Sequence, residues 1–124
     1  MLHSDGSPTR TFCYVADAVV GYYKVLVRGR AGEAYNIGVE EPEISMLELA
    51  ERVANLARQL FGYGGSVKRL PNSDPEYLTD NPTRRCPVIT KAREELDYRP
   101  GISLEEGLRR TLIWYSDNRE AEAS

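Results

Sequence analysis

Residues 4–17 read SDGSPTRTFCYVAD, and in this stretch a turn, an arginine, a short aromatic segment and a helix start follow one another directly. The run from Asp5 to Pro8 has the composition of a turn, because its glycine can adopt positive φ and its proline has a fixed φ. The threonine and aromatic residues after it favour an extended segment over residues 11–14. The turn therefore places Arg10 at the edge of a strand, beside a loop.

Helical periodicity extends outward from this stretch. Apolar residues at helical spacing predict a first helix from about Ala16 to Arg30. Ser45 with Glu48, and Ser103 with Glu106, have the spacing of capping boxes, so each pair marks the start of a further helix. A shorter helix is expected between them, over residues 90–98.

Strand-like segments alternate with these helices. Residues 33–38 read as a short buried strand that ends at a glycine, and residues 66–70 as another strand. Residues 71–87 form a polar, proline-punctuated loop that is long for a compact domain, and such loops usually carry function. Residues 1–124 are thus expected to form one small α/β domain in which short strands alternate with helices.

Composition excludes several classes of function. The chain has 16 Lys and Arg against 19 Asp and Glu, a net charge of −3, and no basic cluster of the kind that binds nucleic acid. No apolar run is long enough for a membrane helix, and the first residues lack the basic-then-apolar pattern of a secretion signal, so we expect a soluble, cytoplasmic protein. Cys13, Cys86 and His3 lack metal-ligand spacing, so no metal site is expected.

Five motifs occur in a familiar order along the chain. GSPTRTFCYVAD is followed by YNIG at residues 35–38, EISMLELA at 43–50, RRCPVI at 84–89 and LEEGL at 104–108. This order resembles the C-terminal, substrate-binding portion of the extended short-chain dehydrogenase/reductases. These are the NAD-dependent nucleotide-sugar epimerases, dehydratases and decarboxylases, and UDP-glucuronate decarboxylase is similar in particular. The resemblance covers nearly the whole chain and implies carbohydrate metabolism.

Two features that this family needs for catalysis are missing from the sequence. The chain has no Gly-rich turn between a strand and a helix, the element that binds the pyrophosphate of a dinucleotide. It also has no Tyr-x-x-x-Lys pair for general-base catalysis. The resemblance implies NAD for a complete enzyme, but we expect this chain alone to lack the Rossmann half, to bind no cofactor and to have no catalytic residues.

The candidate substrate-binding residues are chosen for a nucleoside diphosphate, whose close negative oxygens suit a guanidinium. The resemblance implies that Arg10 and Arg85 contact the diphosphate, with Arg84 as the alternative to its neighbour. The alternative for each arginine is a surface ion pair with a carboxylate. Asn36 is expected either to donate to a phosphate or ribose oxygen or to stabilise local backbone. Asn81 stands where many relatives have an aspartate, and its carbonyl oxygen can accept from a ribose hydroxyl.

Three glutamates at positions 40, 41 and 43 form an acidic loop, which we interpret as solvated and not as a metal site. Two hypotheses for the whole chain follow. One is a nucleotide-sugar-binding portion that needs a nucleotide-binding partner domain for hydride transfer. The other is a free-standing, non-catalytic module that binds a sugar nucleotide or interacts with another protein. In both, an exposed apolar face predicts self-association or contact with a partner domain.

Overall fold

The structure is a computed structural model that describes residues 5–68 and 82–118. Within these residues it has four helices: α1 (Val15–Arg28), α2 (Met46–Phe61), α4 (Thr90–Leu96) and α5 (Leu104–Asp117). It also has three strands of two residues each: β1 (Thr9–Arg10), β2 (Ile44–Ser45) and β3 (Arg84–Arg85). This composition confirms the expected small α/β domain.

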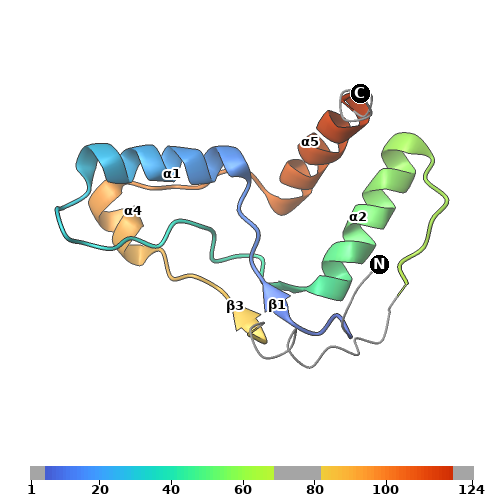
Figure 1. The fold of residues 1–124 in the computed structure, drawn as a ribbon, viewed down its shortest axis with the longest axis horizontal. Helices are drawn as coiled ribbons and strands as arrows, with labels where there is room; N and C mark the ends of the chain where they lie inside the picture. Colours follow the sequence, from blue (N-terminus) through green and yellow to red (C-terminus); the bar gives the residue numbers. More distant parts are fainter. Residues whose placement is uncertain (1–4, 69–81, 119–124) are drawn as a thin grey trace.

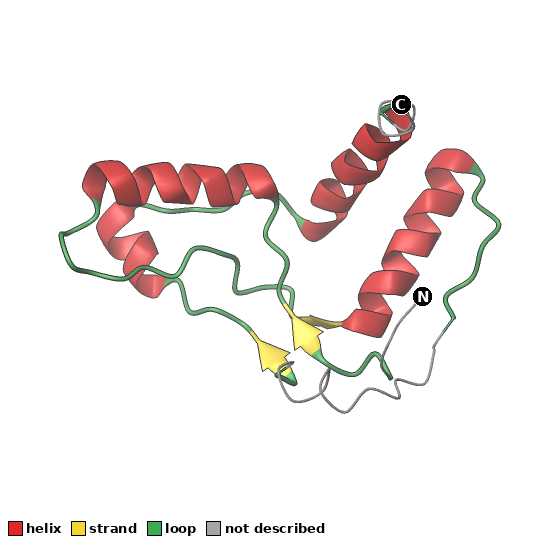
Figure 2. Cartoon of the chain, in the orientation of Figure 1, coloured by secondary structure: helices red, strands yellow, loops and turns green. Residues whose placement is uncertain are grey.

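The helices form two pairs, one at each end of the molecule, with the strands between them (Figure 1). Helix α1 lies on α4 at one end, and α2 contacts α5 at the other. The chain passes through the sheet between α1 and α2 and between α2 and α4, whereas the segment from α4 to α5 runs beside α1 without entering the sheet (Figure 2). The sheet and this segment therefore join the two ends of the fold.

The helix starts follow the local sequence closely. The Ser45 hydroxyl accepts a hydrogen bond from the Glu48 N–H at 3.1 Å, and the Ser103 hydroxyl accepts one from the Glu106 N–H at 3.2 Å. Both predicted caps are confirmed. Helix α1 begins one residue before the predicted start and ends two residues earlier, at Arg28, while α4 ends at Leu96.

The predicted strands are wrong. Residues 11–14, 33–38 and 66–68 contain no strand, and residues 69–81, with most of the predicted loop, lie outside the described part. A strand-like sequence becomes a strand only when another strand bonds to it, and none in the described ranges is placed beside residues 33–38. The observed sheet has the order β2-β1-β3, antiparallel on one side and parallel on the other.

The main buried cluster lies between α1 and α4. It consists of Ile89, Ala92, Leu96 and Tyr98, with Ile37 packed against it. The Tyr98 hydroxyl donates to the carbonyl oxygen of Gly38 at 3.1 Å, and burial raises the pKa of this hydroxyl. Residues 37–38 are therefore held by packing and one side-chain hydrogen bond, in place of a sheet ladder.

Asp17 links α1 to the segment that leads into α5. One of its carboxylate oxygens accepts hydrogen bonds from the backbone N–H groups of Gly101, at 3.1 Å, and Ile102, at 2.8 Å. The residue lies in the first turn of α1, where a negative charge is favoured by the helix dipole. Asp17 thus combines a favourable position at the helix start with a tertiary contact.

The described residues contain no helix that combines the length and the apolar character needed to cross a bilayer.

Gly21 is where α1 comes closest to the buried cluster, and it generates a prediction about stability. A Cβ atom there would lie 2.5 Å from Ile37 Cγ2 and 3.0 Å from Tyr98 Cε2. Alanine has a higher helix propensity than glycine by about 1 kcal/mol, whereas overpacking costs about 1–3 kcal/mol. We therefore expect Gly21→Ala to lower the free energy of unfolding by about 1 kcal/mol in urea denaturation.

The matched control is Gly64→Ala, because a Cβ atom at Gly64 would have no neighbour within 4 Å. This variant should unfold at the same urea concentration as the unchanged chain. A Gly21→Ala variant that is more stable than the unchanged chain would contradict the close packing of α1.

Candidate functional site

The sheet register determines which side chains share a face. In the parallel pair of β1 and β3, Thr9 is opposite Arg84 and Arg10 is opposite Arg85. Opposite residues of adjacent strands project from the same face, and successive residues project from opposite faces. The structure therefore brings Arg10 and Arg85 together on one face of the sheet and places Arg84 on the other.

Arg84 is part of a hydrogen-bonded group with Glu43 and Thr9. Its Nε lies 2.9 Å and 3.1 Å from the two Glu43 carboxylate oxygens, and its Nη2 lies 2.7 Å from Oε2. The Thr9 hydroxyl donates to Oε1 of the same carboxylate at 2.6 Å. The bonds from Arg84 and then from Thr9 lower the pKa of Glu43. Of the two adjacent arginines, Arg84 is thus the one held in an ion pair.

Arg10 is fixed by backbone carbonyl groups. Its Nη1 donates to the carbonyl oxygen of Thr9 and its Nη2 to that of Pro82, each at 2.7 Å. Half-buried between β1 and the start of β3, the guanidinium has a defined position. It is a pre-positioned cation, which reduces the entropy lost when an anion binds.

Arg85 differs from its neighbour in its contacts. Its side chain is exposed and makes no hydrogen bond or ion pair within residues 5–68 and 82–118. Because it is opposite Arg10 in the ladder, the two guanidinium groups originate from strands about 4.8 Å apart. Arg10 and Arg85 thus lie on neighbouring strands and on the same face of the sheet.

Asn36 lies in the loop after α1 and not on the sheet that carries Arg10 and Arg85. Its Nδ2 donates to the carbonyl oxygen of Val88 at 3.1 Å, so the amide joins two distant segments and does not stabilise a local turn. It lines an open apolar depression of about 550 Å³ together with Tyr22, Leu26 and Pro87. Asn81, the remaining candidate, lies outside the described residues.

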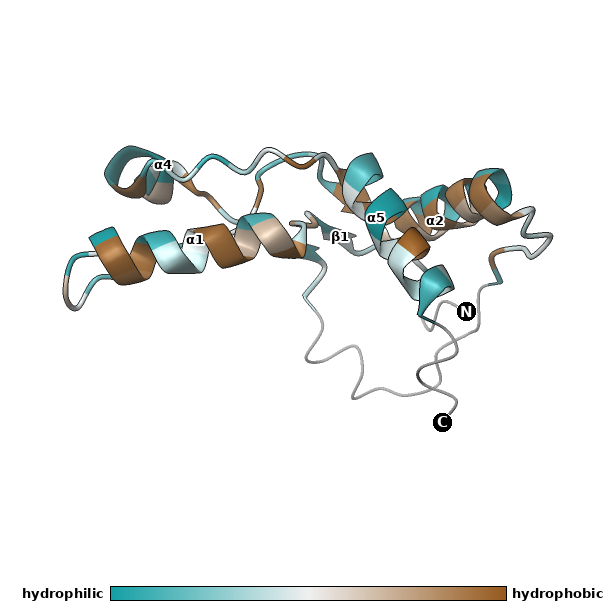
Figure 3. Ribbon diagram, turned by 90° about the horizontal axis from the view of Figure 1, so that it is seen from above, coloured by the Kyte–Doolittle hydropathy of each residue, from teal (hydrophilic) through white to brown (hydrophobic). Residues whose placement is uncertain are grey.

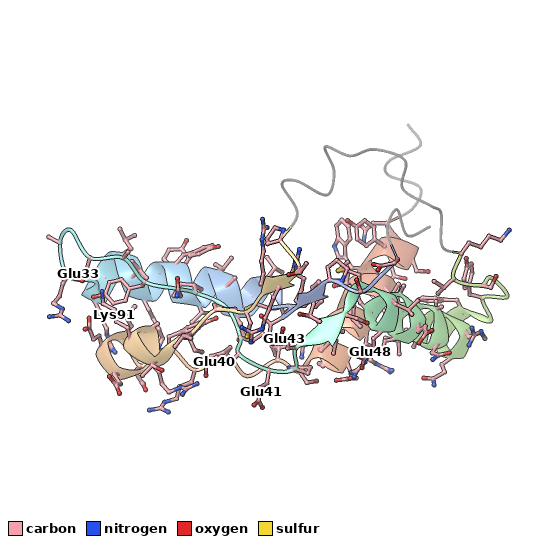
Figure 4. The ribbon with its side chains drawn as sticks, turned by 90° about the horizontal axis from the view of Figure 1, so that it is seen from below. Glu33, Glu40, Glu41, Glu43, Glu48 and Lys91 are labelled. Carbon is pink, nitrogen blue, oxygen red and sulfur yellow. The ribbon has the colours of Figure 1, made fainter. Side chains whose placement is uncertain are left out.

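The acidic loop before β2 is more ordered than its sequence suggested. Figure 4 shows Glu40, Glu41 and Glu43 near one another on this loop. Glu40 accepts from the Ile89 N–H at 3.1 Å and from Arg93 at 2.9 Å, and these bonds lower its pKa. The interpretation as a solvated loop is therefore wrong for Glu40 and Glu43. Side-chain alternation along the strands could have identified Glu43 as a neighbour of Thr9. Glu43 lies two residues before Ser45, which is opposite Thr9, so the two residues share a face.

The glycine cluster at residues 62–65 does not have the geometry of a dinucleotide-binding turn. Gly62 ends α2 in the left-handed conformation, with φ of 66°, so the glycines at 62–65 follow a helix instead of opening one. Their N–H groups cannot combine with a helix N-terminus to hold a pyrophosphate. The first N–H groups of α2 donate instead to the carbonyl oxygens of Pro8 and Gly6. In residues 5–68 and 82–118, no three metal-ligating side chains lie together.

Comparison with known sequences connects this arrangement to a family. The profile of the NAD dependent epimerase/dehydratase family matches residues 1–38. The dTDP-D-glucose 4,6-dehydratase of Bos taurus is 34% identical over 119 residues, which are 94% of this chain and 32% of that protein. UDP-glucuronic acid decarboxylase 1 of Arabidopsis thaliana is 37% identical over 111 residues, 90% of this chain and 23% of that protein.

Solved structures agree with the sequence relatives. The epimerase Mth375 of Methanothermobacter thermautotrophicus superimposes with a TM-score of 0.78 and 36% identity, over 97% of this chain and 33% of that one. The Bordetella bronchiseptica enzyme WbmF, solved with NAD+ and UDP, gives a TM-score of 0.71 and 28% identity, over 94% of this chain and 31% of that one. The chain spans about a third of the length of the first of these relatives. It belongs to the NAD-dependent epimerase/dehydratase family of extended short-chain dehydrogenase/reductases.

Proposed function

We propose that this chain is the nucleotide-sugar-binding part of an NAD-dependent epimerase, dehydratase or decarboxylase, and that Arg10 and Arg85 bind the diphosphate. The observation that carries the proposal is their shared face in the parallel ladder. Two guanidinium groups supply paired, charge-assisted hydrogen bonds to neighbouring phosphates. The complex of WbmF with UDP supports this ligand class, because UDP contains such a diphosphate.

Arg84 is left out of the proposed site because Glu43 occupies its guanidinium. Asn36 and Asn81 remain proposed contacts to the ribose or sugar. One of the two Asn36 amide N–H groups donates to Val88, so the second N–H and the carbonyl oxygen remain for contacts to a hydroxyl. Asn81 directly precedes Pro82, whose carbonyl oxygen accepts from Arg10.

Hydride transfer is proposed to require a further dinucleotide-binding domain, and α1 offers the surface for it. Seven apolar side chains of this helix are between 42% and 79% exposed: Val15, Val19, Val20, Tyr22, Tyr23, Leu26 and Val27. The hydrophobic bands of α1 are visible in Figure 3. The charged Asp17 and Lys24 are turned away from this face, because they bond to residues 96–102. A continuous uncharged face on a small domain is typical of a covered interface.

The first experiment compares UDP binding by calorimetry at low salt for the unchanged chain, Arg10→Ala, Arg85→Ala and Arg84→Ala. Loss of a charge-assisted hydrogen bond weakens binding by about tenfold or more, so Arg10→Ala and Arg85→Ala should each reach that loss. Arg84→Ala removes the same charge from the opposite face, together with the ion-pair partner of Glu43, and should weaken binding less than Arg85→Ala does.

Uridine, which lacks phosphate, should bind too weakly to measure and serves as the ligand control. UDP binding that depends on Arg84 and not on Arg85 would contradict the assignment of the two faces. An unchanged chain that does not bind UDP would contradict the proposal that this segment recognises the diphosphate.

The second experiment tests the apolar face of α1 by sedimentation of the chain alone. With the face uncovered, the average mass should rise with concentration, because copies of the chain associate through it. Leu26→Glu places a charge where the side chain is 79% exposed, so it should shift the chain toward the monomer without unfolding it. Ile113→Glu on α5 is the control and should leave association unchanged. A monomer at high concentration, or an effect of Ile113→Glu alone, would count against α1 as the interface.

A further inference from the structure

Glu43 lies at the point where all three strands meet. It directly precedes β2, it accepts from the Thr9 hydroxyl of β1 at 2.6 Å, and it forms an ion pair with Arg84 of β3 at 2.7 Å. One carboxylate therefore connects every strand of the sheet. Only a quarter of its side chain is exposed, compared with 65% for that of Arg84.

The strands themselves supply few bonds to define their register. Each has two residues, and the parallel side is connected by the bonds from the Thr9 N–H to the Thr83 carbonyl, 2.9 Å, and from the Thr11 N–H to the Arg85 carbonyl, 3.3 Å. A slip of one residue in such a pairing moves every side chain to the other face. In β3 a slip would exchange Arg84 and Arg85, two residues of the same type.

From this geometry we infer that Glu43 is a positioning residue for the anion site of Arg10 and Arg85. By binding Arg84 on one face it selects Arg85 for the other, beside Arg10. It does not touch the ligand, because it projects from the face opposite the two arginines. This inference rests on the proposed function for its ligand, a nucleoside diphosphate, and it adds a residue on the far side of the sheet to that site.

The direction in which Glu43→Ala changes the UDP affinity distinguishes a positioning role from a purely electrostatic one. Glu43→Ala removes a negative charge near an anion site, which by Coulomb attraction alone strengthens UDP binding. Loss of the register predicts the reverse, a UDP affinity about tenfold weaker, as is typical when a supporting residue of a binding site is lost. Glu41→Ala is the matched control: it removes the same charge two positions away, and Glu41 makes no side-chain bond within the described residues.

The experiment measures UDP affinity by calorimetry and strand register by NMR in the same samples. Nuclear Overhauser effects between the backbone protons of Arg10 and Arg85 report the register without any ligand. We expect Glu43→Ala to lose these effects and the affinity together, Glu43→Gln to lose part of both, and Glu41→Ala to keep both.

Thr9→Val tests the same connection where Glu43→Ala does not fold, since it removes one hydroxyl and keeps the side-chain shape. It should weaken UDP binding and the interstrand effects less than Glu43→Ala does. Interstrand effects that persist in the variants of Glu43 and Thr9 overturn the inference, as does UDP binding that stays equal or becomes stronger. The unchanged chain could fail to bind UDP while the Glu43→Ala variant loses the nuclear Overhauser effects between Arg10 and Arg85. In that case the proposed function fails, but the role of Glu43 in setting the strand register stands.

Discussion

The pairing of Thr9 and Arg10 with strands on both sides is the constraint on which the rest of the structure depends. β1 is the central strand of the sheet, and the turn before it also accepts the first N–H groups of α2. The two helix pairs contact each other little, so their relative position follows from these few residues and from the hydrogen bonds that Asp17 accepts from Gly101 and Ile102. A short sheet can serve this purpose because buried neighbours support it, as with Ile44, which is 4% exposed.

Sequence reasoning succeeded where the determinants were local. A capping serine needs only a partner three residues away, so the starts of α2 and α5 could be predicted from Ser45 and Ser103. Strands depend on partners distant in sequence, and here local pattern and pairing disagree. Residues 33–38 have a strand-like sequence and no ladder, whereas Arg84 and Arg85 have charged, exposed side chains and form a strand.

The same distinction between local and long-range determinants applies to the candidate site. The motif around Arg10 and the arginines before Pro87 could be recognised from sequence, but the choice between Arg84 and Arg85 could not. That choice depends on a register between residues more than seventy positions apart, and on Glu43, which in sequence looks like one of several solvated acids. The role of Asn36 was also not local: its amide bonds to Val88, and only the fold brings these two residues together.

Although the chain is acidic, the sheet places Arg10 and Arg85 on one face, and Arg84 with Glu43 on the other. The net charge is −3, yet Glu43 is neutralised by Arg84 and Glu40 by Arg93, and these pairs draw two of the three carboxylates of the 40–43 loop into fixed contacts. Ion pairs at this exposure add little stability. Their effect is on placement, since each carboxylate that is held by its own cation is kept from folding back onto Arg10 or Arg85. The same glutamate that neutralises one arginine thereby leaves the adjacent arginine available to an anion from outside.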